Sequence, residues 1–107
     1  MNEYEKSINR FIAVLRQSGI PFQEVYLYGS YARNKQHEWS DIDLGVITEQ
    51  FAVDSIEETI QLQLLAHQIN PALSPVSIHQ EDLNNRYCSL GQTIKKEGKP
   101  LLNNAHP

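Results

Sequence analysis

The sequence predicts a single small domain of the α/β (α+β) class, in which helices cover a small mixed sheet. Three observations support this prediction. The chain has 107 residues, which suits one domain with one modest core. Apolar residues recur alternately at helical and at strand spacing, and no repeat or Pro/Gly-rich linker divides the chain. We therefore expect one domain over residues 1–107, in the order helix, strand, helix, strand, helix, strand, helix.

The first four elements are predicted from residues 4–46. A helix is indicated by apolar residues at helical spacing, and Gly19 and Pro21 end it. Residues 22–28 alternate and are rich in β-branched and aromatic types, which favours a strand that stops at Gly29. Residues 31–35 could form about two helical turns. In residues 42–46 apolar side chains alternate with Asp43 and Gly45, as expected when one face of a strand is buried.

The third helix is predicted from Ser55 to about Asn70. Ser55 stands three residues before Glu58, which is the spacing of a capping box. Its expected buried stripe comprises Ile56, Ile60, Leu64 and Leu65.

A last strand and a last helix follow. Residues 75–79 alternate, and we expect Val76 and Ile78 to face the core. A helix is predicted over residues 81–96, ended by Gly98. Its apolar side is expected to carry Leu83, Tyr87, Leu90 and Ile94.

Charge and composition exclude several classes of protein. Nine Lys and Arg against 13 Asp and Glu give a net charge of −4, which argues against a general nucleic-acid binder, because such proteins neutralise phosphates with a basic surface. The single cysteine, Cys88, excludes an internal disulfide and a Cys-based zinc site. No apolar run approaches the ~20 residues that span a bilayer, and the N-terminus lacks a signal peptide's apolar region. We expect a cytoplasmic protein with no membrane partner.

The stretch from Leu27 to Ile47 carries the residues that indicate chemistry. A strand that ends in Gly29-Ser30 and leads into a helix leaves backbone N–H groups free to attract a phosphate. Asp41 and Asp43 lie two apart on the next strand, so their side chains share one face at ~7 Å spacing. Carboxylates so placed suit Mg²⁺, and two such ions would serve phosphoryl chemistry. Alone, the first feature is usually a turn and the second a solvated strand face, but together they predict a site.

These residues resemble the signature of the minimal nucleotidyltransferase family in the DNA polymerase β superfamily. That signature is Gly-Ser, ten residues, then Asp-x-Asp, and Gly29-Ser30 and Asp41-Ile42-Asp43 have this spacing. Ala32-Arg33 and Ser40 also match the family's pattern, and residues 94–102 look like its closing helix and short final strand.

The resemblance implies transfer of a nucleoside monophosphate from an NTP, with ATP favoured, to an acceptor hydroxyl. Asp41 and Asp43 would be the catalytic ligands of two Mg²⁺ ions, while Gly29, Ser30 and Arg33 would bind the nucleotide. The implied partner is a second chain, either a HEPN-type toxin that this antitoxin would AMPylate or another copy of the chain. Antibiotic-modifying adenylyltransferases share the signature but need an additional acceptor-binding domain.

Two departures from the family pattern matter. Asn34 stands where glycine is common, and asparagine tolerates left-handed geometry. Family members also carry a third carboxylate on the strand that follows, and the alternation predicts Ser77 at that position. His79 on the same face, or Glu81 and Asp82 beyond it, could replace that acid. If none does, the alternative is a catalytically degenerate module that binds nucleotide and acts by binding a partner.

Overall fold

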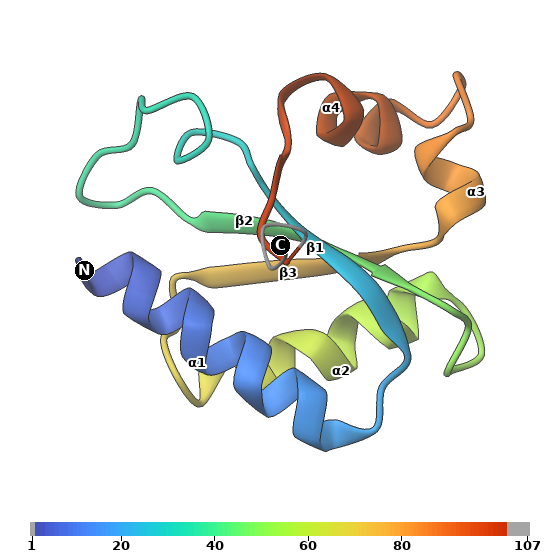
Figure 1. Cartoon of the computed structure of the whole chain (residues 1–107), viewed down its shortest axis with the longest axis horizontal. Helices are drawn as coiled ribbons and strands as arrows, with labels where there is room; N and C mark the ends of the chain where they lie inside the picture. Colours follow the sequence, from blue (N-terminus) through green and yellow to red (C-terminus); the bar gives the residue numbers. More distant parts are fainter. Residues whose placement is uncertain (1, 103–107) are drawn as a thin grey trace.

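The computed structural model describes residues 2–102 and contains four helices and four strands in these residues. They follow the order α1 (Glu3–Ser18), β1 (Phe22–Tyr28), β2 (Ile42–Thr48), α2 (Ser55–His67), β3 (Leu73–Ile78), α3 (Gln80–Leu83), α4 (Ser89–Glu97) and β4 (Lys99–Pro100). Helices α1 and α2 lie on one side of the sheet, and α3 and α4 lie on the other (Figure 1). No helix among the described residues is long and apolar enough to cross a bilayer.

The strands form one mixed sheet in the order β3-β2-β1-β4. Strand β1 pairs antiparallel with both β2 and β4, and β2 pairs parallel with β3. The predicted fold class is therefore confirmed, as is the short final strand. Strand β3 begins at Leu73, two residues earlier than predicted, and contains Pro75. Because β3 is an edge strand, a residue without an N–H is tolerated there.

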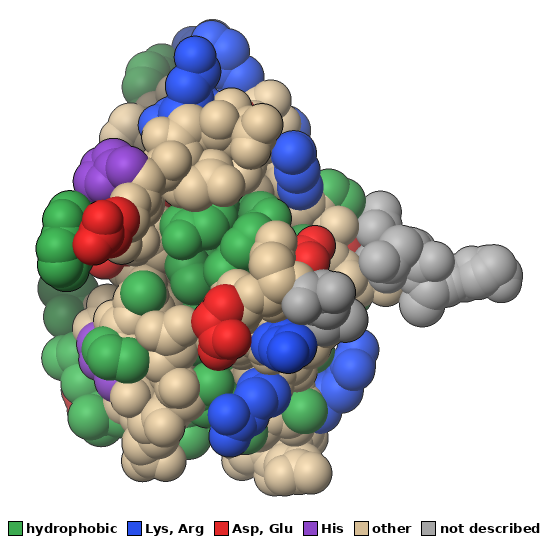
Figure 2. All heavy atoms as spheres, turned by 90° about the vertical axis from the view of Figure 1, so that its left-hand side faces the viewer, with side chains coloured by type: hydrophobic (Ala, Val, Ile, Leu, Met, Phe, Trp, Pro, Cys, Tyr) green, Lys and Arg blue, Asp and Glu red, His purple; other side chains and the backbone are tan. Residues whose placement is uncertain are grey.

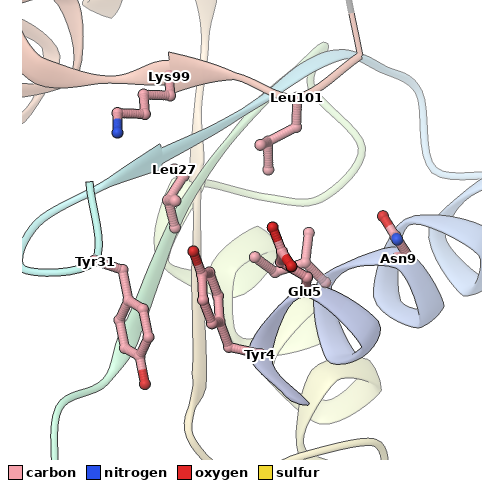
Figure 3. A pocket seen from close by; sticks show the side chains of 8 residues that line it. Tyr4, Glu5, Asn9, Leu27, Tyr31, Lys99 and Leu101 are labelled. Carbon is pink, nitrogen blue, oxygen red and sulfur yellow. The ribbon is translucent and has the colours of Figure 1, made fainter. Parts of the chain in front are cut away.

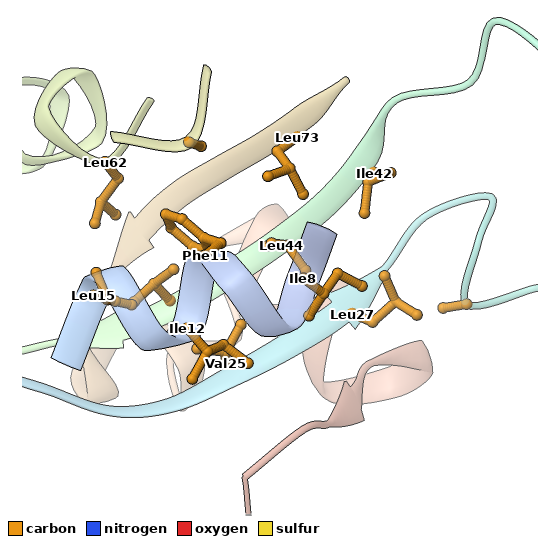
Figure 4. Packing of buried hydrophobic residues seen from close by; sticks show 13 residues of the cluster. Ile8, Phe11, Ile12, Leu15, Val25, Leu27, Ile42, Leu44, Leu62 and Leu73 are labelled. Carbon is orange, nitrogen blue, oxygen red and sulfur yellow. The ribbon is translucent and has the colours of Figure 1, made fainter. Parts of the chain in front are cut away.

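The main core lies between the sheet and the helices α1 and α2 (Figure 4). The predicted apolar face of α1 is buried, with Phe11 and Leu15 fully inaccessible. The helix starts where the Asn2 side chain accepts a hydrogen bond from the Glu5 N–H, and Gly19 ends it in a left-handed conformation. Alternate residues of the strands complete this core: Val25, Leu27, Ile42, Leu44, Val46 and Leu73.

A second, smaller core lies on the opposite face of the sheet. Ile47 and Ile78 pack there against Leu83 and Ile94 from α3 and α4. Gly45 makes the close approach of α4 possible, because a Cβ atom at this position would lie 2.6 Å from Cδ1 of Ile94. This core covers only part of the face, and Asp43 projects from the same face beyond it.

The prediction for α2 was wrong about the buried face. Ile56, Ile60 and Leu64 are exposed, and of the predicted stripe only Leu65 packs against the main core. The buried residues of the helix are Glu58, Leu62 and Ala66. The cap is also one residue earlier than predicted, because the Asp54 side chain accepts a hydrogen bond from the Glu57 N–H at 2.9 Å. Glu58 has turned inward instead of closing a capping box.

The last predicted helix is two helices. Helix α3 ends at Leu83, and α4 begins after Cys88, whose sulfur accepts a hydrogen bond from the Gly91 N–H. Leu83 and Ile94 are buried as predicted, but Tyr87 lies in the connection and is 80% exposed. The break lets α4 return towards β1 and place its C-terminal end beside the Gly29-Ser30 turn.

Candidate active site

The Gly29-Ser30 turn follows directly after β1, but no helix follows it. Residues 29–34 form consecutive turns, in which Gly29 O accepts from Arg33 N at 3.1 Å and Ser30 O accepts from Lys35 N at 2.8 Å. The predicted helix at residues 31–35 was wrong because Asn34 has a φ of 57°, which interrupts a right-handed helix. This is the left-handed geometry that asparagine was expected to tolerate.

Glycine is required at position 29 for two reasons. Its φ is +76°, in the left-handed region that other residues rarely adopt. In addition, a Cβ atom there would overlap with Oδ2 of Asp43. The turn and the Asp43 carboxylate, separated in sequence, are therefore brought into direct proximity, as the signature predicted.

Asp43 lies on β2 directly opposite Tyr28 of β1, and Asp41 precedes the strand. Burial raises the pKa of Asp43 above its ordinary value of 3.8, and the negative charge of Asp41 raises it further, whereas Arg33 lowers it. Burial, with the charges of Asp43 and Glu97, raises the pKa of Tyr28 to about 12. The surroundings of Asp43 therefore disfavour its negative charge in the absence of a cation.

Glu97 is a site residue that the sequence analysis missed. Its Oε2 atom accepts a hydrogen bond from Gly29 N at 2.8 Å, and Oε1 and Oε2 accept from Arg33 Nη1 at 3.1 Å and 3.0 Å. The hydrogen bond from Gly29 lowers the pKa of Glu97, and Arg33 contributes to the decrease. One signal could have revealed it: an acid in the last turn of a helix is disfavoured by the dipole unless another group compensates.

A Gly-Ser turn against the second aspartate of an Asp-x-Asp motif is the arrangement that the signature predicts, and the comparison with known families agrees with it. The family model described as "Polymerase beta, Nucleotidyltransferase" matches residues 11–106. The chain belongs to the polymerase β nucleotidyltransferase family. The resemblance drawn from Gly29-Ser30 and Asp41-Ile42-Asp43 is therefore confirmed at the level of family.

The chain is similar to a protein adenylyltransferase and to chains from toxin–antitoxin crystal structures. The protein adenylyltransferase MntA of Shewanella oneidensis is 32% identical over 93 residues, which make up 87% of this chain but only 63% of MntA. The crystal structure of a toxin–antitoxin with AMP-PNP is 30% identical, with a TM-score of 0.63 over 86% of this chain and 69% of its own. The toxin–antitoxin MntA-HepT is 25% identical, with a TM-score of 0.58 over 90% of this chain and 69% of its own. This chain therefore spans less than two thirds of the length of MntA.

The third carboxylate of the nucleotidyltransferases was sought at the wrong position of β3. Ser77 is buried and faces α2, where its hydroxyl donates to Glu58 Oε1 at 2.9 Å and lies 2.6 Å from Thr48 Oγ1. The β2–β3 register pairs Asp43 with Ser74, so Ser74 is the residue beside Asp43 on the same face. The prediction failed because residues on both faces of β3 are at least partly buried, so alternation alone did not identify the face that carries the site.

The other candidates for that acid do not gather around Asp43. His79 Nε2 lies 2.8 Å from Glu58 Oε1, so His79 belongs to the network beneath α2. Glu81 and Asp82 lie in the first turn of α3. Within residues 2–102, no three His, Cys, Asp or Glu side chains group closely enough to hold a metal ion.

A cavity of about 620 Å³ lies beside the turn, on the α1 face of β1. The rings of Tyr4 and Tyr31 lie 4.6 Å apart at its edge, and Leu27 and Leu101 point into it (Figure 3). Figure 2 views the end of the molecule that carries the loop after β1, where apolar side chains are exposed among acidic and basic ones. Tyr31 packs against the edge of the main core. Trp39, the other aromatic residue near the signature, is 81% exposed.

Proposed function

We propose that this chain transfers AMP from ATP to a hydroxyl group of a partner protein and acts as the antitoxin of a HEPN-type toxin. The observation that carries the proposal is the direct approach of the Asp43 carboxylate to Gly29 of the turn. This contact puts a candidate metal ligand next to backbone that can hold phosphate. The relative named a protein adenylyltransferase and the toxin–antitoxin complexes support the choice of a protein acceptor.

The donor set around Asp43 fits Mg²⁺. Burial and the charge of Asp41 both raise the pKa of Asp43, and a divalent cation would relieve this unfavourable pairing of carboxylates. Mg²⁺ takes one or two carboxylates together with substrate phosphates, so Asp41 and Asp43 suffice as its protein ligands. When bound, the metal neutralises the phosphates and activates the attacking hydroxyl.

The chain's own residues would bind and orient the nucleotide. The Ser30 hydroxyl makes no hydrogen bond to another described residue, and it can donate to a phosphate oxygen. Arg33 supplies a guanidinium that can pair with phosphate in two places. The acceptor oxygen bonds to the α-phosphorus while the bond to the bridging oxygen breaks and pyrophosphate leaves. Because Ser74 cannot act as a base at neutral pH, the hydroxyl proton passes to a base of the partner or to solvent.

The test is transfer of label from α-labelled ATP, with Mg²⁺, to the product of the adjacent gene, which we expect to be a HEPN-type protein. We expect label on the partner, with the transfer rate of Asp43→Asn reduced by at least about 100-fold, since it lacks a ligand charge. Asp54→Asn is the matched control, because asparagine also caps a helix and Asp54 lies at the start of α2. Absence of label on that partner and on a second copy of the chain would contradict the proposal.

Ser74 favours a second candidate function, that of a module which binds nucleotide and masks its partner without catalysis. Serine beside Asp43 leaves β3 without an acid next to the pair, and among the described residues no three His, Cys, Asp or Glu side chains group closely enough to hold a metal ion. Calorimetry with MgATP separates the two functions when it is run beside the transfer assay. Binding of MgATP and of the partner without any transfer would favour the module.

A further inference from the structure

We infer that Glu97 sets the nucleotide affinity of this site by competing with the triphosphate for the Gly29 N–H and the Arg33 guanidinium. The inference rests on the proposed function, because it takes these two groups as phosphate ligands. It identifies a residue that determines binding and that lies outside the Gly-Ser and Asp-x-Asp signature.

The hydrogen bonds of Glu97 are those that a bound phosphate needs. Gly29 N has a single hydrogen, and the structure directs it to Glu97 Oε2 at 2.8 Å. Arg33 Nη1 lies 3.0 Å and 3.1 Å from the two oxygens of the same carboxylate. Carboxylate and phosphate are both oxyanions that accept from N–H groups and pair with guanidinium. A phosphate oxygen cannot take the Gly29 hydrogen while Glu97 holds it.

Charge adds to this competition. Glu97 offsets the positive charge of Arg33, so the guanidinium has little attraction left for an incoming phosphate. The negative charge of Glu97 also reaches the neighbouring site residues, since it contributes to the raised pKa of both Tyr28 and Asp43. A triphosphate that approaches this end of the sheet is therefore repelled by Glu97 in addition to being denied two ligands.

The Glu97 side chain can leave without disturbing the core. Glu97 is the last residue of α4, next to Gly98, and its side chain is 22% exposed. Arg33 is 52% exposed, so solvent screens this ion pair in part and its contribution to stability is modest. Nucleotide binding thus requires only that one side chain turn into solvent.

The test compares the affinity of the wild-type chain, Glu97→Gln and Glu97→Ala for MgATP, by calorimetry without partner. Both variants remove the competing charge, and we expect the Kd for MgATP to fall by about fivefold, which corresponds to the upper range for an exposed ion pair. Inorganic tripolyphosphate should show the same change, because the competition is for phosphate. Glu57→Gln removes the same charge from an exposed position on α2 and should leave both Kd values unchanged.

Three outcomes are distinguishable. A lower Kd and a lower KM for ATP in the transfer assay, with the thermal midpoint unchanged, support the competition. A Kd that is unchanged or raised in both variants overturns it, and a raised Kd with a lower thermal midpoint shows that Glu97 holds the turn in place. If label transfer by the wild-type chain persists in that case, the proposed function stands without the inference. If no protein binds MgATP or transfers label, both proposals are wrong.

Discussion

Charges of opposite sign are distributed unevenly around the Gly29-Ser30 turn. Asp41, Asp43 and Glu97 bring three carboxylates to its neighbourhood, and Arg33 brings one guanidinium. Asp41 is exposed to solvent, whereas Asp43 and Glu97 are partly buried, so a donor or a cation is needed to stabilise their charges. Glu97 accepts from Gly29 and Arg33, whereas none of the described residues donates a hydrogen bond to Asp43, and this difference is why Asp43 is the residue that suits a metal.

Ser74 and Ser77 differ by three positions in β3 and therefore face opposite sides of the sheet. We expect Ser74→Asp to raise the rate of AMP transfer by about 100-fold, because it supplies a base beside Asp43. The measurement is label transfer to the partner at saturating MgATP. An unchanged rate in a folded Ser74→Asp variant would show that the β3 residue beside Asp43 does not limit catalysis.

Ser77→Asp is the informative comparison for that variant. It places a second carboxylate against the buried Glu58, whose Oε1 accepts from the Ser77 hydroxyl at 2.9 Å. We expect the free energy of unfolding to decrease by about 3 kcal/mol, with no gain in transfer rate. Chemical denaturation of both serine variants would test this difference, and a Ser77→Asp protein as stable as the wild type would contradict the burial argument.

Glu58 is a buried carboxylate that holds several segments together. It accepts hydrogen bonds from Phe51 N at 2.9 Å and from Ser77, and it is paired with His79. Burial acts to raise the pKa of Glu58, but the hydrogen bonds from Phe51, His79 and Ser77 outweigh this effect, so the pKa lies below its ordinary value of 4.5. The carboxylate therefore joins the loop after β2 to the end of β3.

This lowered pKa predicts a dependence of stability on pH. A group whose pKa is lower in the folded state stabilises the protein above its unfolded pKa, and the stabilisation is lost as the pH falls through the folded value. We expect the free energy of unfolding to decrease as the pH falls below about 4.5. Glu58→Gln should lower stability by about 2–4 kcal/mol at pH 7 and flatten that decrease. Denaturation curves at several pH values would check both effects, and an unchanged acid limb would contradict the role of Glu58.

At the scale of the element, the apolar pattern of α2 predicts the wrong buried face. Two stripes of the helix are compatible with burial, and the more hydrophobic one, with Ile56 and Ile60, is exposed. The buried one contains Leu62 and Ala66 with the Glu58 carboxylate. The charged Glu58 made burial of this stripe unexpected from the sequence. Its carboxylate is nevertheless stabilised, because Phe51 and Ser77, which lie outside the helix, donate hydrogen bonds to it.

Substitutions on the two faces of α2 test this orientation. Leu62 is fully buried and Leu64 is 63% exposed. We expect Leu62→Ala to decrease the free energy of unfolding by about 2–5 kcal/mol, and the matched Leu64→Ala to change it by less than about 0.5 kcal/mol. Equilibrium unfolding in urea measures both values. A larger loss at Leu64 would mean that the helix is rotated as the sequence pattern suggested.

Helix α4 contributes both to the second core and to the candidate site. Its inner face contributes Ile94 to the second core, and Gly45 on β2 gives that side chain room to approach. Its last residue is Glu97, whose carboxylate reaches the turn after β1. Because Ile94 fixes the helix against the sheet, the position of Glu97 relative to Gly29 depends on this packing.

At the scale of the whole molecule, the two faces of the sheet have different uses. The face under α1 and α2 is covered along its length and carries the main core (Figure 4). The other face is covered by α3 and α4 only over its part near Ile47 and Ile78. Asp43 lies beyond this second core, and Tyr28 at the end of β1 packs at its edge, so the incomplete covering of this face leaves Asp43 and Ser30 partly exposed.

The sequence by itself determined the family, the class of fold and the proximity of the turn to Asp43. These follow from local properties: apolar periodicity, which sets the element types, and the spacing of Gly29-Ser30 to Asp41-Ile42-Asp43. The residue types at Gly29 and Asn34 are also explained locally, since both residues adopt a left-handed backbone conformation. Such features need no knowledge of which elements lie side by side.

Only the tertiary structure decided the contacts between distant segments. Glu97 is 68 residues from Gly29, and no periodicity relates the two. Alternation showed that Val76 and Ser77 face opposite ways, but the pairing of Asp43 with Ser74 and the packing of α2 decided which face carries the site. The physical reason is the same in both cases: local pattern fixes the relative directions of side chains within an element, whereas their surroundings depend on long-range packing.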